Sequence, residues 1–498
     1  MGAVLPNSFD FHSQMTRTHP GPISPHPNIN GNPDECEGMM GGGESRAEGD
    51  YATQEGGEID DGGNRALDSC YSGGDMAESS IEQAPGISAP AAPAPVEFSP
   101  RVLRRHLAAI ACLGCVYATS GILPFLARQR FGAANWQTTV LTAAVPVTQF
   151  FAIFWNHLYA RIPTRTYLII IGLLACGPLA LIGTARTIWE VMFYFVLAAL
   201  GGAGGVASLS PISADLLRTC YYPGRHGRIF AVLCVVQFTA TMVAGQIMGS
   251  WSDRNPDAFR IYFPILALLM LGGLVFFGLI SRDAAWQNRI RYTPASGGSW
   301  WTPLKDMRTI LKADRRFAGY EAAFMSYGIG WMICTALVPA LATDQLHLNY
   351  SQFAQATIVV YQLVNILLFL PLGRVSDRFG PMRLASASFL WLTIYPIGLM
   401  FTGSALELGA CVTFYAVGMV GVQLTWTLGP LQLSGDSAKA PHYLAIHSTM
   451  VGFRGIVAQG LGMALYSMTD SFAIPLAMAA AGFAWGSWRM RALSQGRP

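Results

Sequence analysis

The sequence predicts an all-α integral membrane protein with twelve transmembrane helices behind a disordered N-terminal tail. Charged residues make up 12% of the 498 residues and hydrophobic residues 52%, whereas a soluble protein carries about 25% charged residues. After residue 100 the apolar residues gather in runs close to the ~20 residues that cross ~30 Å of hydrocarbon. Basic residues collect at alternate ends of these runs. Lipid is therefore the expected solvent for most of the chain.

The first 100 residues form an acidic segment of different composition. They contain 16 acidic and three basic residues and are rich in Gly, Pro and Ser. Such a segment cannot bury enough apolar surface to offset the entropy lost on ordering. It has neither the basic start nor the apolar core of a signal peptide. We expect residues 1–100 to be a disordered cytosolic tail, either regulatory or simply solvated.

Twelve apolar runs follow the tail, and each is predicted to cross the membrane as a helix. The fourth run contains the glycine-rich stretch Gly201–Gly205, where we expect close packing against another helix rather than phosphate binding. The predicted spans are residues 106–126, 136–156, 167–184, 190–213, 228–251, 261–280, 318–341, 352–372, 384–402, 408–432, 443–467 and 471–488.

The distribution of basic residues predicts the orientation. With a cytosolic N-terminus, the cytosolic loops and ends hold 23 Lys and Arg residues and the opposite side holds five. Cytosolic loops of membrane proteins carry an excess of Lys and Arg. Both termini are therefore expected in the cytosol, and the protein is expected in the plasma (cell inner) membrane.

Two six-helix halves are predicted from internal repeats. Gly201 of the fourth span corresponds to Gly418 of the tenth at an offset of 217 residues. A long basic loop at residues 281–317 separates the sixth span from the seventh. Internal repeats of this kind indicate two related halves. We expect residues 101–280 and 318–491 to form two six-helix bundles, joined by a cytosolic linker that contains an interfacial helix.

The loop after the eighth predicted span has a distinctive pattern. The spacing G-x-x-x-D-R-x-G-x-x-R is formed by Gly373, Asp377, Arg378, Gly380 and Arg383, between two apolar runs. This spacing resembles the signature loop of the major facilitator superfamily, the twelve-helix secondary transporters. The resemblance extends over the chain beyond the tail. It implies two six-helix bundles that rock around a central site.

The resemblance also implies a latch on the cytosolic side. In this family the acid of the loop is thought to hold an interface helix of the opposite half when the carrier opens outward. Arg228, at the start of the fifth span, is the expected partner of Asp377, because a positive helix N-terminus favours an aspartate. In the first-half loop Arg161 is retained but Ala160 replaces the acid. We expect one ionic latch; the alternative is that Asp377 only caps a local turn with its neighbouring arginines.

Ionisable residues inside predicted spans are candidates for substrate binding or coupling, because each costs at least ~2.5 kcal/mol on insertion scales. Arg454 lies about 16 Å into the eleventh span and Glu321 about 8 Å into the seventh. His447 precedes Arg454 by seven residues and shares its helix face. Arg454 either pairs with Glu321, which makes both structural, or binds an anionic substrate. Proton symport is not indicated, because Glu321 is shallow.

Amide and aromatic side chains mark the expected cavity. The resemblance implies that helices one, four, seven and ten line it, and that helices two, five, eight and eleven flank the interface between halves. A small organic solute of unknown class, anionic if Arg454 binds it, suits such a lining. The alternative is that these side chains only hold helices together. The residues are Gln237, Tyr327, Trp331, Gln362, Asn365, Gln423 and Trp426.

No motif in the chain indicates an enzyme. There is no Walker loop, nucleophile elbow, dinucleotide-binding loop or metal-ligand cluster, so neither a cofactor nor a metal is expected. The expected partners are the lipid bilayer and a small-molecule substrate, without nucleic acid, and the protein is expected to work as a monomer. Two functions fit: alternating-access transport of a small organic solute, secondary active or facilitative, and a transporter-like membrane sensor or scaffold that binds a ligand without moving it.

Overall fold

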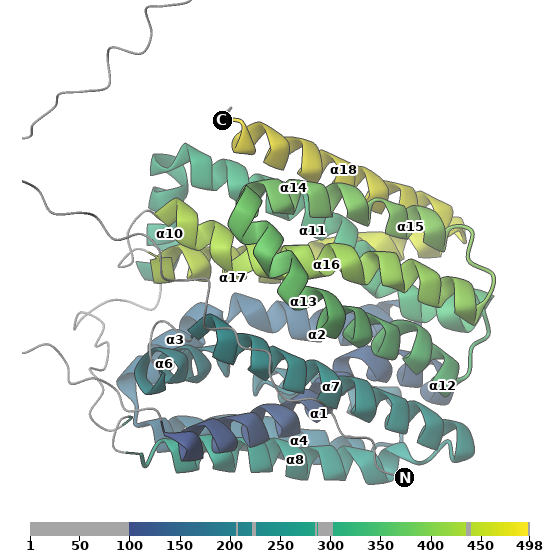
Figure 1. The fold of residues 1–498 in the computed structure, drawn as a ribbon. Helices are drawn as coiled ribbons and strands as arrows, with labels where there is room; N and C mark the ends of the chain where they lie inside the picture. The colour runs from purple at the N-terminus through teal and green to yellow at the C-terminus, as the bar shows by residue number, and fades with distance from the viewer. Residues whose placement is uncertain are drawn as a thin grey trace, which may run out of the picture. The chain divides into compact units, whose positions relative to one another are not determined.

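The described residues form helices joined by loops, and no strand occurs among them (Figure 1). The chain divides into two units, Met1–Ala89 and Pro90–Pro498. The acidic tail predicted for residues 1–100 lies outside the described residues apart from its last two positions, so its disorder stays a prediction. The computed structural model describes residues 99–205, 208–221, 226–283, 286, 302–434 and 440–496.

The helices of the first half begin and end at residues suited to those positions. They are α1 Pro100–Phe131, α2 Asn135–Phe150, α3 Ala152–Arg161, α4 Thr164–Ile182, α5 Ile188–Leu200, α6 Ser210–Cys220, α7 His226–Arg254 and α8 Phe259–Ile280. Pro100 starts α1, where the N–H that proline lacks is not needed. Gly132 ends α1 in the left-handed region, with φ 61°. Thr187 and Glu190 form a capping box at the start of α5.

The second half contains longer helices and two π-helical turns. They are α10 Thr302–Ala313, α11 Arg315–Ala340, η2 Leu341–Gln345, α12 Tyr350–Phe353, η3 Ala354–Val359, α13 Val360–Phe379, α14 Pro381–Leu392, α15 Ile394–Leu399, α16 Ala405–Ser434, α17 Ala440–Thr469 and α18 Ala473–Ser494. Helix α10 lies in the predicted linker. Asp314 caps α11 by accepting a hydrogen bond from the N–H of Phe317 at 2.9 Å.

Seven helices in the described part are long and apolar enough to cross a membrane, and there are eight spans if α2 and α3, bent by 52°, count as one. The predicted spans 190–213 and 384–402 are each divided into two shorter helices. The predicted spans 443–467 and 471–488 are the continuous helices α17 and α18, which are not among these seven. The count of twelve therefore stays a proposal.

The glycine run divides the span predicted at 190–213 instead of lying inside one helix. Gly202 and Gly204 have φ values of 101° and 81°, which glycine adopts without steric cost. Helices α5 and α6 are therefore separate. The expected close packing is nevertheless present, because a Cβ on Gly201 would lie 2.5 Å from the backbone N of Ala175 in α4.

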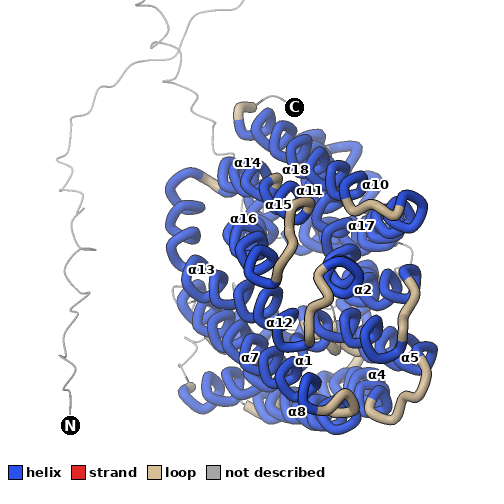
Figure 2. The backbone as a smooth tube through the Cα atoms, turned by 90° about the vertical axis from the view of Figure 1, so that its right-hand side faces the viewer, coloured by secondary structure: helices blue, strands red, loops and turns tan. Residues whose placement is uncertain are grey.

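Two large clusters of buried apolar residues organise the described helices. One is built mainly from α1 to α8 and also includes Ile358; the other is built from α11 to α18 and also includes Phe125. Helices from the two clusters meet where α2 packs on α17 and where α7 packs on α12, η3 and α13 (Figure 2). These helices correspond to the second, fifth, eighth and eleventh predicted spans, which were expected to flank the interface.

Candidate functional site

A cavity of about 390 Å³ is lined by helices of both apolar clusters. Helices α1, α2 and α7 contribute to one side, and α11, α12, η3, α13, α15, α16 and α17 to the other. Three of the predicted residues, Trp331, Gln362 and Trp426, line it, together with Tyr117 and Gln149. Its volume falls in the range of ~300–1,000 Å³ found for ligand pockets. The lining offers aromatic faces for stacking and amides for hydrogen bonding.

Arg454 lies behind the aromatic wall of this cavity. Its side chain is 1% exposed, and its Nη1 donates to the carbonyl oxygen of Phe324 at 2.5 Å. The guanidinium carbon lies 5.3 Å from the ring centre of Tyr327, 5.7 Å from that of Trp331 and 5.9 Å from that of Trp426. These are cation–π distances. The structure thus joins Arg454 with three of the aromatic residues that were predicted separately.

Glu321 is paired with His447 rather than with Arg454. The Nδ1 atom of His447 lies 2.9 Å and 3.1 Å from the two carboxylate oxygens of Glu321, and both residues are buried. The ring of His447 packs edge-on against Phe324 at 4.8 Å and Trp426 at 4.3 Å. The contacts therefore do not show the predicted pair of Glu321 with Arg454; they pair Glu321 with His447 instead. The alternative, that Arg454 binds an anion, is left open.

The predicted amides have different surroundings. Gln423 donates to the hydroxyl of Tyr361 at 2.8 Å and to Asn365 at 3.2 Å, so these side chains hold α13 and α16 together. Gln362 lines the cavity, and its Oε1 has no hydrogen-bond partner among the described residues. Gln237 is half-buried on α7, where its backbone packs against α1, and it is not among the residues that line the cavity.

The predicted signature loop is mostly helix. Helix α13 continues to Phe379, and only Gly380, with φ 83° and ψ 153°, separates it from α14. Gly373 lies inside α13, and Asp377, Arg378 and Arg383 are exposed. The span predicted to end at residue 372 was therefore too short, because the polar residues of the motif form the last turns of the same helix.

The expected latch is not closed in this structure. Asp377 and Arg228 are both exposed, and no ion pair joins Asp377 to Arg228, or to Arg378, within the described ranges. Arg161 ends α3 and is exposed. Neither the latch nor the local turn cap is tested by this geometry, and both stay predictions.

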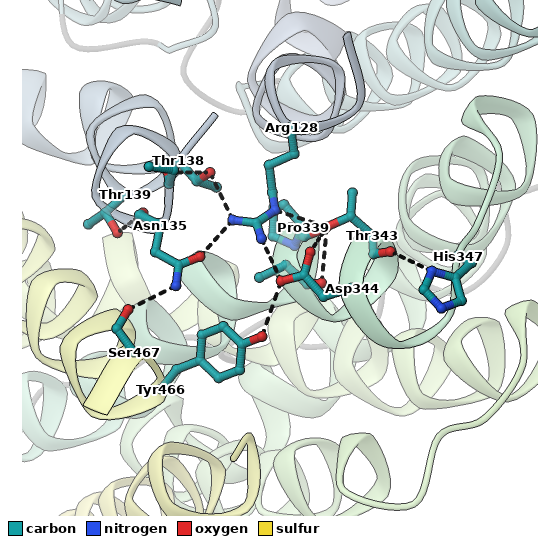
Figure 3. A network of polar contacts seen from close by, with 12 residues as sticks. Arg128, Asn135, Thr138, Thr139, Pro339, Thr343, Asp344, His347, Tyr466 and Ser467 are labelled. Atoms are coloured by element: carbon teal, nitrogen blue, oxygen red, sulfur yellow. Dashed lines mark hydrogen bonds and ion pairs between the residues drawn. The ribbon is translucent and has the colours of Figure 1, made fainter. Parts of the chain in front are cut away.

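A polar network joins the two clusters at the opposite ends of the helices (Figure 3). Arg128 of α1 pairs with Asp344 of η2 at 2.5 Å and donates through Nε to Thr343 at 2.9 Å. It also donates to Asn135 of α2 at 2.9 Å, and Asn135 donates to Ser467 of α17 at 2.9 Å. The guanidinium of Arg128 thus links α1 directly to η2 and α2, and Asn135 extends the network to α17.

Two further contacts strengthen this face, which we call the Arg128 face. The hydroxyl of Tyr466 in α17 donates to Asp344 at 3.1 Å (Figure 3). The carboxylate of Asp253 in α7 accepts hydrogen bonds from the backbone N–H groups of Tyr350 and Ser351 at 2.8 and 3.0 Å. An acceptor at a helix N-terminus is favourable because those N–H groups have no partner inside the helix.

Sequence reasoning missed this network. Arg128 is one of the five basic residues counted on the side opposite the cytosol, but its partner Asp344 is 216 residues away in the chain. The available signal was that both are ionisable groups at the ends of apolar runs on the same predicted face. Spacing along one chain does not show which run ends lie together, so the pair was not predicted.

Comparison with known families decides what kind of protein has this arrangement. The sequence profile of the Major Facilitator Superfamily matches residues 106–459, well over half of the chain. The chain belongs to the Major Facilitator Superfamily. It is therefore an integral membrane protein from a family of secondary transporters, as the signature spacing predicted.

Relatives of this facilitator are named as multidrug resistance proteins. Multidrug resistance protein MdtH from Shigella flexneri and from Escherichia coli (strain K12 / DH10B) is 22% identical to it over 287 residues. The match covers 56% of this chain and 66% of each relative, so it spans just under two thirds of their length.

Solved structures of other transporters share the fold of this facilitator. A peptide transporter POT in complex with sulfate has a TM-score of 0.64 and 14% identity, and the match covers 80% of this chain and 95% of that one. The nucleoside transporter NupG (D323A mutant) has a TM-score of 0.61 and 12% identity, with coverage of 79% and 99%. A POT family transporter in complex with 5-aminolevulinic acid has a TM-score of 0.62 and 12% identity, covering 77% and 95%. All three proteins are transporters.

Proposed function

We propose that this facilitator carries a small organic solute across the membrane by alternating access. The observation that supports it best is the cavity lined by both apolar clusters, with a polar network beyond one end of it. Pro124 of α1 lines the cavity, and Arg128 follows it by one helical turn, about 6 Å. Contacts that reach from one cluster to the other around a solute site are what a rocking carrier must make and break.

The proposed architecture has twelve spans in two six-helix bundles, residues 101–280 and 318–491, joined by the linker 281–317. The separate apolar clusters support this division. The divided helix pairs α5/α6 and α14/α15 each supply one span in this proposal, and α17 and α18 supply the last two. Helix α17 carries the buried polar residues His447, Arg454 and Gln459, as expected of a helix next to a binding site rather than one that faces lipid alone.

The structure corresponds, in this proposal, to a carrier held shut at the Arg128 face and unlatched at the signature-loop face. The closed ion pair between Arg128 and Asp344 and the exposed side chains of Asp377 and Arg228 support this assignment. We place the signature-loop face and both termini in the cytosol, because bases concentrate on that side, and we propose the plasma (cell inner) membrane as the location. The bundles complete the cavity within one chain, so a monomer suffices.

The cavity lining supports a solute with a planar or aromatic body. Trp331 and Trp426 offer ring faces for stacking, and the unpartnered Oε1 of Gln362 offers a hydrogen-bond acceptor. A negative charge on the solute is compatible with the buried guanidinium of Arg454 behind these rings. The related fold that holds 5-aminolevulinic acid, a small organic acid, is consistent with such a solute.

Counterflow in proteoliposomes tests this function. Vesicles loaded with an unlabelled solute that thermally stabilises the protein should transiently accumulate the labelled solute from outside. Trp331→Ala and Gln362→Leu, which alter the cavity lining, should lower the rate, whereas Gln246→Leu on α7, outside that lining, should not. A solute that stabilises the protein but shows no counterflow would identify a sensor and overturn the proposal.

A further inference from the structure

Arg454 presents a free fork of two N–H groups in the interior of the protein. Its Nη1 is engaged by the carbonyl oxygen of Phe324, whereas Nε and Nη2 are buried and have no hydrogen-bond partner in the described part of the chain. Nε and Nη2 lie along one edge of the planar guanidinium. Two N–H groups on one edge match the two oxygens of a carboxylate, which accepts both bonds in parallel.

The described side chains around Arg454 do not take up this edge. Glu321, the acid predicted to pair with it, makes its close contacts with His447. The rings that surround the guanidinium attract its charge through their faces but accept no hydrogen bond in the plane of the fork. A buried cation with unmade hydrogen bonds is unfavourable, because its lost hydration is not replaced. An anion with two acceptor oxygens removes that cost.

Helix α11 leaves space for the guanidinium of Arg454 at Gly328, which has no side chain. A Cβ on Gly328 would overlap Cζ of Arg454, so the two could not coexist. Glycine at this position therefore makes the space that the planar group occupies. This arrangement fixes the orientation of the fork, so that Nη1 faces Phe324 and the opposite edge remains available.

We propose that Arg454 is the carboxylate-binding subsite of the central cavity. The body of an organic acid lies against Trp331 and Trp426, and its carboxylate accepts two hydrogen bonds from Nε and Nη2. Both rings line the cavity, and their centres lie 5.7 and 5.9 Å from the guanidinium carbon; the proposal requires one of these rings to turn aside so that the carboxylate reaches the fork. The inference rests on the proposed function, because it takes the cavity as the substrate site.

The test uses pairs of ligands that differ only in charge. The purified full-length protein is titrated with aromatic and aliphatic monocarboxylates and with their primary amides, and thermal stabilisation is measured. Each amide has nearly the shape of its acid but lacks the negative charge. The same titrations are run on Arg454→Lys, which keeps a cation without the fork, and on Arg454→Gln, which removes the charge.

Carboxylates should stabilise the wild type, while the matched amides should not. In both variants the carboxylate affinity should fall by about tenfold or more, the effect of losing charged hydrogen bonds. Equal stabilisation by acids and amides, or carboxylate selectivity that survives both substitutions, would overturn the subsite. Variants that fail to fold without ligand would also overturn the subsite, because Arg454 would then be a packing residue. Counterflow of a neutral solute alone would refute the subsite but leave the transport proposal intact. Carboxylate binding without any counterflow would refute the transport proposal but leave the subsite intact.

Discussion

At the scale of single residues, the two glycines of the signature motif have opposite roles. Gly380 has φ 83° and ψ 153°, a conformation restricted to glycine, although a Cβ there would meet no atom within 4 Å. Gly373 lies inside α13, and a Cβ there also meets nothing. We predict that Gly380→Ala lowers the free energy of unfolding by about 1–3 kcal/mol, while Gly373→Ala leaves it unchanged or raises it by about 0.5–1 kcal/mol. Thermal unfolding in detergent measures both. Equal changes in the free energy of unfolding would show that backbone strain at Gly380 does not determine the effect of the substitution.

Single residues also show where sequence reasoning stops. The spacing of His447 and Arg454 correctly placed both on one buried face of α17, because helical periodicity is a local property. The partner of each was not local. Glu321 and Phe324 are three residues apart on α11, and one accepts from His447 while the carbonyl of the other accepts from Arg454. Which of these two positions on α11 meets which residue of α17 depends on how the two helices are shifted along each other. The spacing of residues along the sequence does not contain this information.

At the scale of helices, α2 and α17 pack closely along a row of small residues. A Cβ on Gly452 would overlap the backbone N of Phe150, and one on Gly455 would lie 2.8 Å from Pro146. Small residues let membrane helices approach closely. Closer to the Arg128 face, Thr142 of α2 donates to Gln459 of α17 at 2.5 Å. The contact therefore runs continuously in an antiparallel sense from one face to the middle.

A methyl group at Gly452 tests this contact. We predict that Gly452→Ala forces α2 and α17 apart, lowers the free energy of unfolding by about 1–3 kcal/mol and slows transport, because the interface can no longer close. Gly460→Ala on the same helix is the matched control, since a Cβ there meets nothing within 4 Å. Thermal unfolding and counterflow rates are measured for both. Wild-type behaviour of Gly452→Ala would mean that α2 and α17 are not in contact during transport.

The helices that sequence analysis misjudged share one physical feature. Hydropathy detects how apolar a run is but not where its backbone turns. The run 190–213 stays apolar through Gly202 and Gly204, whose positive φ values divide it. Conversely, α13 continues past residue 372 although its residues become charged, because the protruding end of a helix needs no lipid. The existence of these elements was predictable; their ends depended on backbone conformation.

At the scale of the whole molecule, the latch predicted from Asp377 concerns a state that this structure does not adopt. We predict that Asp377→Asn and Arg228→Gln each lower the transport rate by about two- to fivefold, the value of an exposed ion pair, and that the double variant is no worse than either. Insertion and thermal stability should be unchanged. Arg383→Gln distinguishes the latch from the local turn cap. If Asp377 only caps a local turn, the effect of Asp377→Asn should depend on Arg383 and not on Arg228. Full transport by Asp377→Asn would remove the latch from the mechanism.

Ion pairs on the Arg128 face are of two kinds. The pair between Arg128 and Asp344 crosses from one apolar cluster to the other. The pair between Arg130 and Asp257, at 3.0 Å, lies within the first cluster, between α1 and the loop before α8. The hydrogen bond from Arg130 holds the pKa of Asp257 below its usual value, so this carboxylate stays ionised at neutral pH. Only the first pair opposes separation of the two halves.

Neutralising Asp344 should therefore shift the carrier toward opening at this face. The lost pair is partly exposed, so we expect the open population to rise by about two- to fivefold. Spin labels at Trp136 on α2 and Met468 on α17, which are 50% and 81% exposed, report the separation of the halves without disturbing the core. In Asp344→Asn the longer distance should gain weight, whereas in Asp257→Asn it should not. Equal distance distributions in the two variants would show that the Arg128 network does not govern this gate, because the only designed difference between them is whether the broken pair crosses the interface.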